Sequence, residues 1–91
     1  MKLYKITASW CLSCIYMNEI FDDVLKNKKL NFEIIDYDYD IDSDKINDFN
    51  IGSTLPVYIL FDNNQEIDRI VGEKSKDDLL TFFDKNGGFV K

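Results

Sequence analysis

The chain contains no histidine, only two cysteines and a single proline. Tetrahedral zinc needs four ligands, so Cys11 and Cys14 could bind this metal only if two chains shared it. The two cysteines are separated by only two residues, so a structural disulfide between them would restrain very little of the chain. A secreted disulfide scaffold is therefore disfavoured, and we expect no bound metal.

Long apolar runs and excess positive charge are also missing. The longest apolar run, Val57 to Phe61, is far too short to span a bilayer, and residues 1–7 lack the continuous apolar stretch of a secretory signal. Lys and Arg number 11 against 17 Asp and Glu, and the formal charge of −6 argues against a nucleic-acid or anionic-membrane surface. We therefore expect a cytoplasmic protein that acts on other proteins or on small neutral molecules.

The composition is that of a globular chain. Of its 91 residues, 45 % are apolar and 14 % aromatic, which is enough to build a hydrophobic core and makes disorder an unattractive interpretation. A chain of this length has no room for a second lobe. We therefore expect one domain, residues 1–91.

The two cysteines stand where a helix is predicted to begin. From Ser13 to about Lys28, apolar residues recur at helical spacing: Cys14, Met17, Phe21, Val24 and Leu25. Cys11 then lies at or just before the helix start, and Cys14 lies about one turn inside. Free N–H groups and the positive end of the helix dipole stabilise a thiolate there, so the pattern indicates a reversible dithiol–disulfide site.

The rest of the chain alternates strands and helices. Strands are predicted at Leu3–Ala8, Phe32–Tyr37, Val57–Phe61 and Glu66–Val71, the last two joined by turn residues from Asp62 to Gln65. A short helix is predicted between a Ser43 cap and Gly52, and a last helix between a Ser75–Asp78 capping box and Gly87-Gly88. The order β-α-β-α-β-β-α predicts an α/β fold with a four-stranded mixed sheet flanked by helices.

Aspartates alternate through residues 36–44 and could be mistaken for a calcium-binding loop. Counting from Asp36, however, the sixth position is Ile41 where the loop needs glycine, and the twelfth is Asn47 where it needs a bidentate glutamate. We interpret these carboxylates as solvated charges at a strand end and a helix start.

Three features match one family. They are the motif Trp10-Cys11-x-x-Cys14, the dipeptide Leu55-Pro56 and Gly72. With the order of elements, they resemble the thioredoxin family over nearly the whole chain, without the family's opening strand and helix, so that the length is closer to that of a glutaredoxin. The resemblance implies a thioredoxin-like fold and a protein-disulfide reductase in which Cys11 attacks a substrate disulfide and Cys14 resolves the mixed disulfide. It implies a thioredoxin-reductase-like electron donor and no bound cofactor other than the redox-active Cys11–Cys14 disulfide. Nothing in the pattern demands a dimer, so we expect a monomer.

The resemblance also implies a substrate-binding surface. It makes Pro56 a cis proline facing the cysteines, with Leu55 and the neighbouring Thr54 offering backbone groups to an extended substrate. Trp10, Leu12 and Ser13 would flank the site, with Trp10 as a partly exposed wall, and Gly72 would leave space for the substrate chain. From the residues alone, a trans proline that starts a strand is the better interpretation of Pro56, and Gly72 is equally explained as a turn between a strand and a helix.

Two positions depart from the family pattern. Thioredoxins keep a buried Asp six residues before the first cysteine, where this chain has Lys5. Lys5 could lower the pKa of a cysteine thiol by Coulomb attraction, or it could pack its stem on the sheet and pair with a carboxylate such as Glu33. The dipeptide Leu12-Ser13 replaces Gly-Pro, and its extra donors predict a redox potential less reducing than that of a typical thioredoxin.

Two other functions fit the pattern less well. A glutathione-dependent glutaredoxin needs basic groups for the glutathione carboxylates, but residues 36–48 are mostly acidic and Arg69 is the only arginine. A non-enzymatic binding module whose cysteines switch a partner surface is the second alternative.

Overall fold

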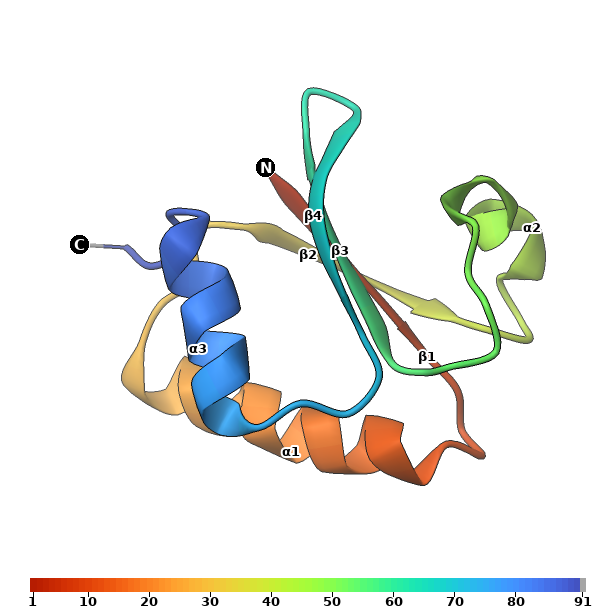
Figure 1. The fold of residues 1–91 in the computed structure, drawn as a ribbon, viewed down its shortest axis with the longest axis horizontal. Helices are drawn as coiled ribbons and strands as arrows, with labels where there is room; N and C mark the ends of the chain where they lie inside the picture. The colour runs from red at the N-terminus through yellow and green to blue at the C-terminus, as the bar shows by residue number, and fades with distance from the viewer. Residues whose placement is uncertain (91) are drawn as a thin grey trace.

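The computed structural model describes residues 1–90, which form a mixed β-sheet flanked by helices (Figure 1). The elements are β1 (Lys2–Thr7), α1 (Leu12–Asn27), β2 (Glu33–Asp38), α2 (Ser43–Ile46), the 3-10 turn η1 (Asn47–Phe49), β3 (Val57–Asp62), β4 (Gln65–Val71) and α3 (Lys76–Lys85). The sheet order is β2-β1-β3-β4, with β1 parallel to β2, and β3 antiparallel to both β1 and β4. The predicted four-stranded mixed sheet and the predicted order of elements are confirmed.

Helices α1 and α3 cover one face of the sheet, and α2 covers the other (Figure 1). Alternation along β3 explains why this strand is apolar throughout: Tyr58 and Leu60 join the core under α1 and α3, whereas Val57 and Ile59 join the core under α2. The sheet therefore buries both faces, and the carboxyl end of β1 leads directly to the cysteines.

The short second helix differs from the prediction at both ends. Ser43 is the first helical residue rather than the cap, which is Asp42, so the predicted Ser43 cap is wrong. The segment tightens into a 3-10 turn and ends at Asn50, whose φ of 55° is left-handed. Asparagine tolerates this conformation, so Gly52 is not needed as a cap and that prediction is wrong as well. The capping box at the start of α3 is confirmed, with Ser75 and Asp78 each bonding the backbone of the other.

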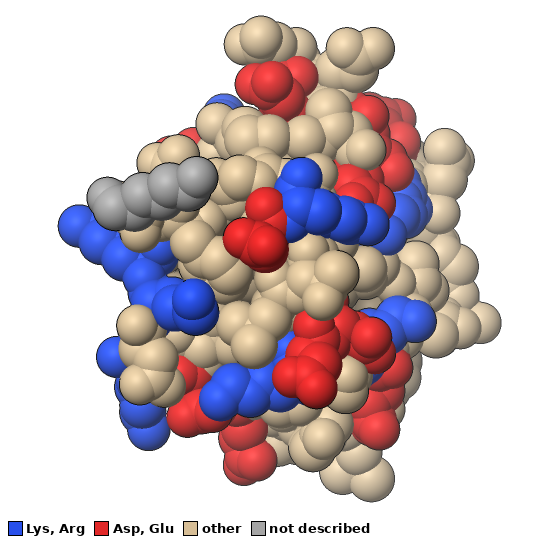
Figure 2. All heavy atoms as spheres, turned by 60° about the vertical axis from the view of Figure 1, so that its left-hand side comes forward, with Lys and Arg blue, Asp and Glu red and all other residues tan. Residues whose placement is uncertain are grey.

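Basic and acidic side chains are intermixed on the face drawn in Figure 2. Ion pairs also join elements of the fold, including Lys76 of α3 with Asp23 of α1, and Lys85 of α3 with Asp68 of β4. Among residues 1–90, no helix has both the length and the apolarity needed to cross a bilayer.

Candidate active site

Both cysteines lie at the amino end of α1. Cys11 is the N-cap, with extended backbone angles, and Cys14 is in the first turn. The backbone N–H of Cys14 donates a hydrogen bond of 3.1 Å to Sγ of Cys11. This N–H is one of the donors that a helix start leaves free, so the Cys11 sulfur receives both a hydrogen bond and the positive end of the helix dipole. The donor on this sulfur is thus the Cys14 amide and not Ser13, from which the sequence predicts extra donors.

The two cysteines differ in access to solvent, and burial changes the acidity of Cys14. Both are free thiols, with 8 % of Cys11 and 1 % of Cys14 exposed. Burial raises the pKa of the Cys14 thiol from 9.0 to about 12, and its side-chain hydrogen bond with Cys11 acts in the same direction. A backbone hydrogen bond at Ala8 opposes this rise in the pKa of Cys14 only in part. Cys11 is therefore the more exposed of the two cysteines, and burial favours the protonated thiol of Cys14.

Two further segments meet the cysteines at this edge of the sheet. The Leu55–Pro56 peptide bond is cis, and Leu55 packs in the same buried cluster as Cys11 and Cys14. The backbone N–H of Gly72 donates to the carbonyl oxygen of Pro56 at 2.8 Å, which holds the end of β4 against the proline. Gly72 has a φ of +84°, and a Cβ there would lie 3.2 Å from Cγ2 of Thr54. The fold thus brings together the CxxC motif, the Thr54–Pro56 segment and Gly72, which are distant in sequence.

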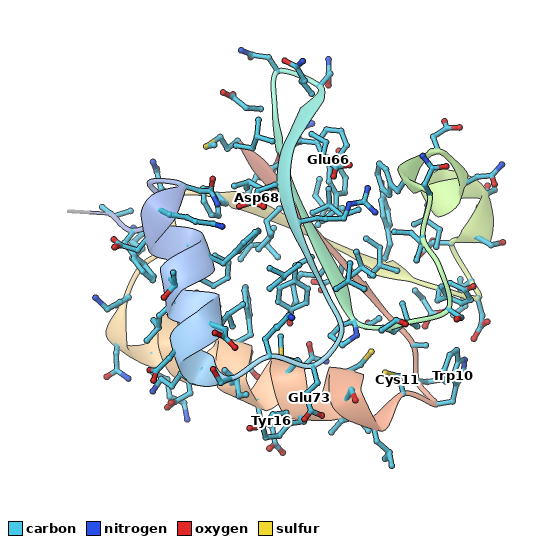
Figure 3. All side chains as sticks on the ribbon, viewed as in Figure 1. Trp10, Cys11, Tyr16, Glu66, Asp68 and Glu73 are labelled. Carbon is cyan, nitrogen blue, oxygen red and sulfur yellow. The ribbon has the colours of Figure 1, made fainter. Side chains whose placement is uncertain are left out.

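Trp10 stands beside Cys11 as an exposed but anchored side chain (Figure 3). It is 59 % exposed, and its Nε1–H donates a 2.7 Å hydrogen bond to Asp40. The indole also meets Tyr39 edge-on, with ring centroids 6.2 Å apart. Leu12 projects further into solvent, at 82 % exposed, and Ser13 is half-buried. The hydrogen bond and the ring contact therefore fix the position of the indole, while its ring face remains exposed to solvent.

The alternating aspartates fix the loop that holds Trp10. The Asp38 carboxylate accepts hydrogen bonds from the amides of Asp40 and Ile41 at 2.8 and 2.9 Å, and the Asp42 carboxylate accepts one from the Asp38 amide at 2.9 Å. These bonds order the backbone that presents Asp40 to the indole. This role of Asp40 could not be predicted from the sequence, because the alternating pattern does not indicate which carboxylate faces the tryptophan.

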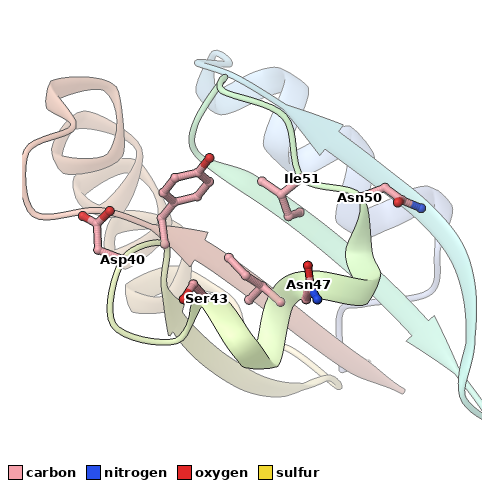
Figure 4. A pocket seen from close by; sticks show the side chains of 7 residues that line it. Asp40, Ser43, Asn47, Asn50 and Ile51 are labelled. Atoms are coloured by element: carbon pink, nitrogen blue, oxygen red, sulfur yellow. The ribbon is translucent and has the colours of Figure 1, made fainter.

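A cavity adjoins the loop on the side of α2 (Figure 4). It has a volume of about 580 Å³, and its lining includes Tyr39, Asp40 and Ile51. Asp40 lines the cavity and also accepts the hydrogen bond from Trp10, so the cavity and the anchored indole share this residue.

Lys5 is buried on the α1 side of the sheet. Only 7 % of it is exposed, and its Nζ lies 3.5 Å from the Asp36 carboxylate and 4.0 Å from the centroid of the Phe21 ring. The parallel register places Lys5 beside Asp36 and leaves Glu33 beside Lys2, so the predicted partner Glu33 is wrong. The expected arrangement, a packed stem with a paired ammonium, is otherwise observed.

One buried polar group was not anticipated at all. Tyr58 faces Lys5 across the β1–β3 pair and is fully buried, and its hydroxyl has no hydrogen-bond partner among the described residues. No sequence signal distinguishes it from the apolar residues around it. Across residues 1–90, no three side chains of the metal-binding types His, Cys, Asp and Glu converge.

Comparisons with known proteins agree with this geometry. Residues 2–85 match the family model described as thioredoxin. Thioredoxin from Mycobacterium bovis is 29 % identical over 78 residues, which is 86 % of this chain and 66 % of that protein. The bifunctional thioredoxin reductase/thioredoxin of Mycobacterium leprae is also 29 % identical over 78 residues, but these are only 17 % of its length. The chain thus spans just under two thirds of the length of the first relative and about one sixth of the length of the second.

Solved structures show the same fold. Thioredoxin 1 from Thermosipho africanus superposes with a TM-score of 0.76 at 20 % identity, covering 94 % of this chain and 93 % of that one. The match to the family model covers nearly all of the sheet and helices that build the site. This chain belongs to the thioredoxin family.

Proposed function

We propose that this protein is a dithiol–disulfide oxidoreductase that reduces disulfides in other proteins, with Cys11 as nucleophile and Cys14 as resolving thiol. One observation carries the proposal: Sγ of Cys11 accepts a hydrogen bond from the Cys14 N–H at the start of a helix. Cys11 also packs in one buried cluster with Leu55, which precedes Pro56 through a cis peptide bond. A sulfur in this setting is stabilised as the thiolate that disulfide exchange requires.

The proposed reaction has two exchange steps. In the first, the Cys11 thiolate attacks one sulfur of the substrate disulfide, and the other substrate sulfur leaves as a thiol after taking up a proton. In the second, Cys14 loses its proton and attacks Cys11, which releases the second substrate thiol and closes the Cys11–Cys14 disulfide. Two electrons pass to the substrate. The greater exposure of Cys11 supports this order of attack.

The substrate chain is proposed to lie along the Thr54–Pro56 segment. The absence of a Cβ at Gly72 keeps the space beside Thr54 open, which supports a role for this glycine in admitting an extended peptide. Trp10, Leu12 and Ser13 would flank the peptide on the other side of the nucleophile. The exposed indole and the exposed Leu12 offer it apolar contact.

The electrons are proposed to come from a thioredoxin-reductase-like protein. A relative named a bifunctional thioredoxin reductase/thioredoxin supports such a donor. Asp40 adds negative charge beside Trp10, and the carboxylates of glutathione would be repelled there, which supports a protein donor over glutathione. The reduced Cys11–Cys14 dithiol carries both electrons and becomes the disulfide when it passes them on, so no metal or organic cofactor is required. One domain over residues 1–91, a monomer and a cytoplasmic location remain predictions.

Protein-disulfide reduction with dithiothreitol as donor tests the proposal. We expect the wild-type protein to accelerate reduction well above dithiothreitol alone, Cys11→Ser to abolish the acceleration, and Cys14→Ser to trap a substrate adduct on Cys11 that mass spectrometry detects. Supplying electrons through thioredoxin reductase or through glutathione then identifies the donor. A wild-type protein that binds disulfide proteins but never exceeds the dithiothreitol rate would identify the chain as a binding module instead.

A further inference from the structure

The cavity on the side of α2 shares its apolar lining with the surroundings of the cysteines. The apolar lining residues, drawn as sticks in Figure 4, are Tyr39, Ile46 and Ile51. Ile46 belongs to the buried cluster that contains Cys11 and Leu55, and Tyr39 and Ile51 pack against that cluster. The cavity volume of about 580 Å³ lies within the range of roughly 300–1,000 Å³ that is typical of ligand pockets. The cavity and the candidate active site are therefore built on one packed cluster.

Trp10 contacts two of the residues that line this cavity. Its indole N–H donates the 2.7 Å hydrogen bond to Oδ2 of Asp40, and its ring meets Tyr39 edge-on. Ile51 stands three residues before Thr54, at the start of the segment along which we place the substrate chain. The lining of the cavity is thus joined both to Trp10 and to the chain that leads to Thr54.

The polar part of the lining carries negative charge and no positive charge. It consists of Asp40 from the loop after β2, Ser43 from α2, and the amide side chains of Asn47 and Asn50 from the two ends of η1. All four residues are exposed to solvent. Among the residues that the structure describes, no lysine or arginine lines the cavity.

Two cations in or against this segment already have partners. Nζ of Lys45 lies 3.6 Å from the Asp42 carboxylate, and Arg69 pairs with Glu66 and donates to a backbone carbonyl oxygen of η1 at 2.8 Å. None of the ion pairs within residues 1–90 includes the Asp40 carboxylate. The charge of Asp40 is therefore available to a ligand in the cavity.

The surrounding charge favours a positively charged ligand. Residues 36–48 carry six aspartates and one lysine. Exposed charges act on each other over a Debye length of about 10 Å at 0.1 M salt, so this segment attracts cations toward the cavity. Asp40 is the one aspartate of this segment that lines it.

We propose that the cavity is a specificity subsite for a basic segment of the substrate protein, in which a lysine or arginine side chain pairs with Asp40 while Cys11 attacks the neighbouring disulfide. The apolar lining packs against the aliphatic stem of that side chain, and the side-chain oxygens of Asn47 and Asn50 are further acceptors for its N–H donors. This inference rests on the proposed function and names its substrate class, disulfide proteins with a basic residue close to the reactive cysteine.

The lining also discriminates against acidic substrates. A substrate carboxylate in the cavity would lie near Asp40 with no lysine or arginine in the lining to offset the repulsion. A neutral side chain would lack the ion pair but avoid the repulsion. We therefore expect the reaction rate to fall in the order lysine, glutamine, glutamate at the substrate position that reaches the cavity.

Peptides that carry one cysteine as a mixed disulfide with thionitrobenzoate test this order. The Cys11 thiolate attacks the peptide sulfur, and coloured thionitrobenzoate leaves as a thiolate, so its release reports the first exchange step. Lysine, glutamine or glutamate is placed in turn at each of three positions on either side of the cysteine, which span about 10 Å of extended chain on each side. At the best position, we expect the second-order rate constant to be about fivefold higher with lysine than with glutamine, the upper end for an exposed ion pair.

Two variants with the same change of net charge show whether Asp40 is responsible. Asp40→Asn keeps a side-chain oxygen for the Trp10 indole but removes the charge, so the ratio of the lysine rate to the glutamine rate should fall to about one. Asp48→Asn is the matched control, because Asp48 belongs to the same acidic segment and is exposed but does not line the cavity. Its ratio should equal that of the wild type.

A third variant tests the cavity rather than the charge. Asn47→Phe places a bulky ring in the lining while Asp40 stays in place, so the preference for lysine should again fall to about one. If this variant does not fold, the Asp40→Asn and Asp48→Asn pair decides the question.

Reaction with dithiobis(nitrobenzoate) is the reference for the cysteines themselves. Attack by Cys11 releases one coloured thiolate in a first phase, and resolution by Cys14 releases another in a second phase. Peptide rates for each variant are divided by its own first-phase rate, so that a change in the reactivity of Cys11 cancels from the comparison.

The outcomes separate the two proposals. A lysine rate that nowhere exceeds the glutamine rate, or a lysine preference that Asp40→Asn and Asp48→Asn change equally, would overturn the subsite and leave the proposed function intact. A wild-type protein that shows no second phase with dithiobis(nitrobenzoate) would instead contradict the dithiol mechanism itself.

Discussion

Replacing Gly72 by alanine tests the substrate groove with one added methyl group. Gly72 follows β4 with a φ of +84°, and its N–H bonds the carbonyl oxygen of Pro56. The new Cβ would stand 3.2 Å from Cγ2 of Thr54, in the space that we assign to the substrate chain. Gly87 is the matched control, because its φ is +69° and a Cβ there would meet nothing within 4 Å.

The expected loss of stability comes mainly from the backbone. An L-residue with a left-handed φ costs about 1–2 kcal/mol, and this cost applies to Gly72→Ala and Gly87→Ala alike. Thr54 is exposed, so its methyl group can shift by the few tenths of an ångström that the contact requires. For a chain of this size, each kcal/mol lowers the melting temperature by roughly 4–8 °C. Both variants should therefore unfold at temperatures below that of the wild type, by similar amounts.

Only Gly72→Ala should impair the reaction with a protein disulfide. Losing about 1 kcal/mol of substrate binding raises KM about fivefold. The first-phase rate with dithiobis(nitrobenzoate) should stay unchanged, because a small disulfide does not need the groove. Steady-state kinetics with a protein disulfide, at a temperature where both variants are folded, measure the difference. Equal KM values for Gly72→Ala and Gly87→Ala would refute the placement of the substrate beside Gly72.

Three further predictions address the anchor of the indole, a helix cap and the resolving thiol. Asp40→Ala removes the acceptor of the Trp10 indole, so the fluorescence anisotropy of this single tryptophan should fall, whereas Asp44→Ala should leave it unchanged. Ser75→Ala breaks the capping box of α3 and should lower the free energy of unfolding in urea by about 1 kcal/mol. Burial raises the pKa of Cys14 from 9.0 to about 12, so the unfolded chain loses this proton at a lower pH than the folded chain does. The stability that the thiol contributes is therefore complete below pH 9 and is lost as the pH rises toward 12. Denaturation measured across this range should show a steeper decline in the free energy of unfolding for the reduced wild type than for Cys14→Ala.

Local patterns were sufficient to predict the fold. The apolar stripe of α1 and the doubly apolar β3 each identify an element and the faces that it buries. Observed boundaries lie close to the predicted ones; α1, for example, begins at Leu12 rather than Ser13. The position of Cys11 at the helix start follows from the same stripe, because helical periodicity fixes where the first turn must lie.

Contacts that depend on register could not be predicted in this way. The parallel pairing of β1 with β2 decides that Lys5 meets Asp36 and not Glu33, and no local pattern encodes that offset. The unpaired hydroxyl of Tyr58 could not be predicted for the same reason. Its aromatic ring is typical of an apolar strand, and only the packed core shows that the hydroxyl is buried without a hydrogen-bond partner among the described residues. At Asn50, a residue able to adopt a left-handed φ ended the turn before Gly52 was reached.

A redox titration in glutathione buffers tests the central claim most directly, namely that Cys11 and Cys14 form a reversible internal disulfide. The masses of the alkylated protein, measured across the range of buffer potentials, report how many thiols remain at each potential. We predict one two-electron transition from two free thiols to an internal Cys11–Cys14 disulfide. A protein that keeps both thiols under oxidising buffer, or that stops at a stable glutathione adduct on Cys11, would contradict the account.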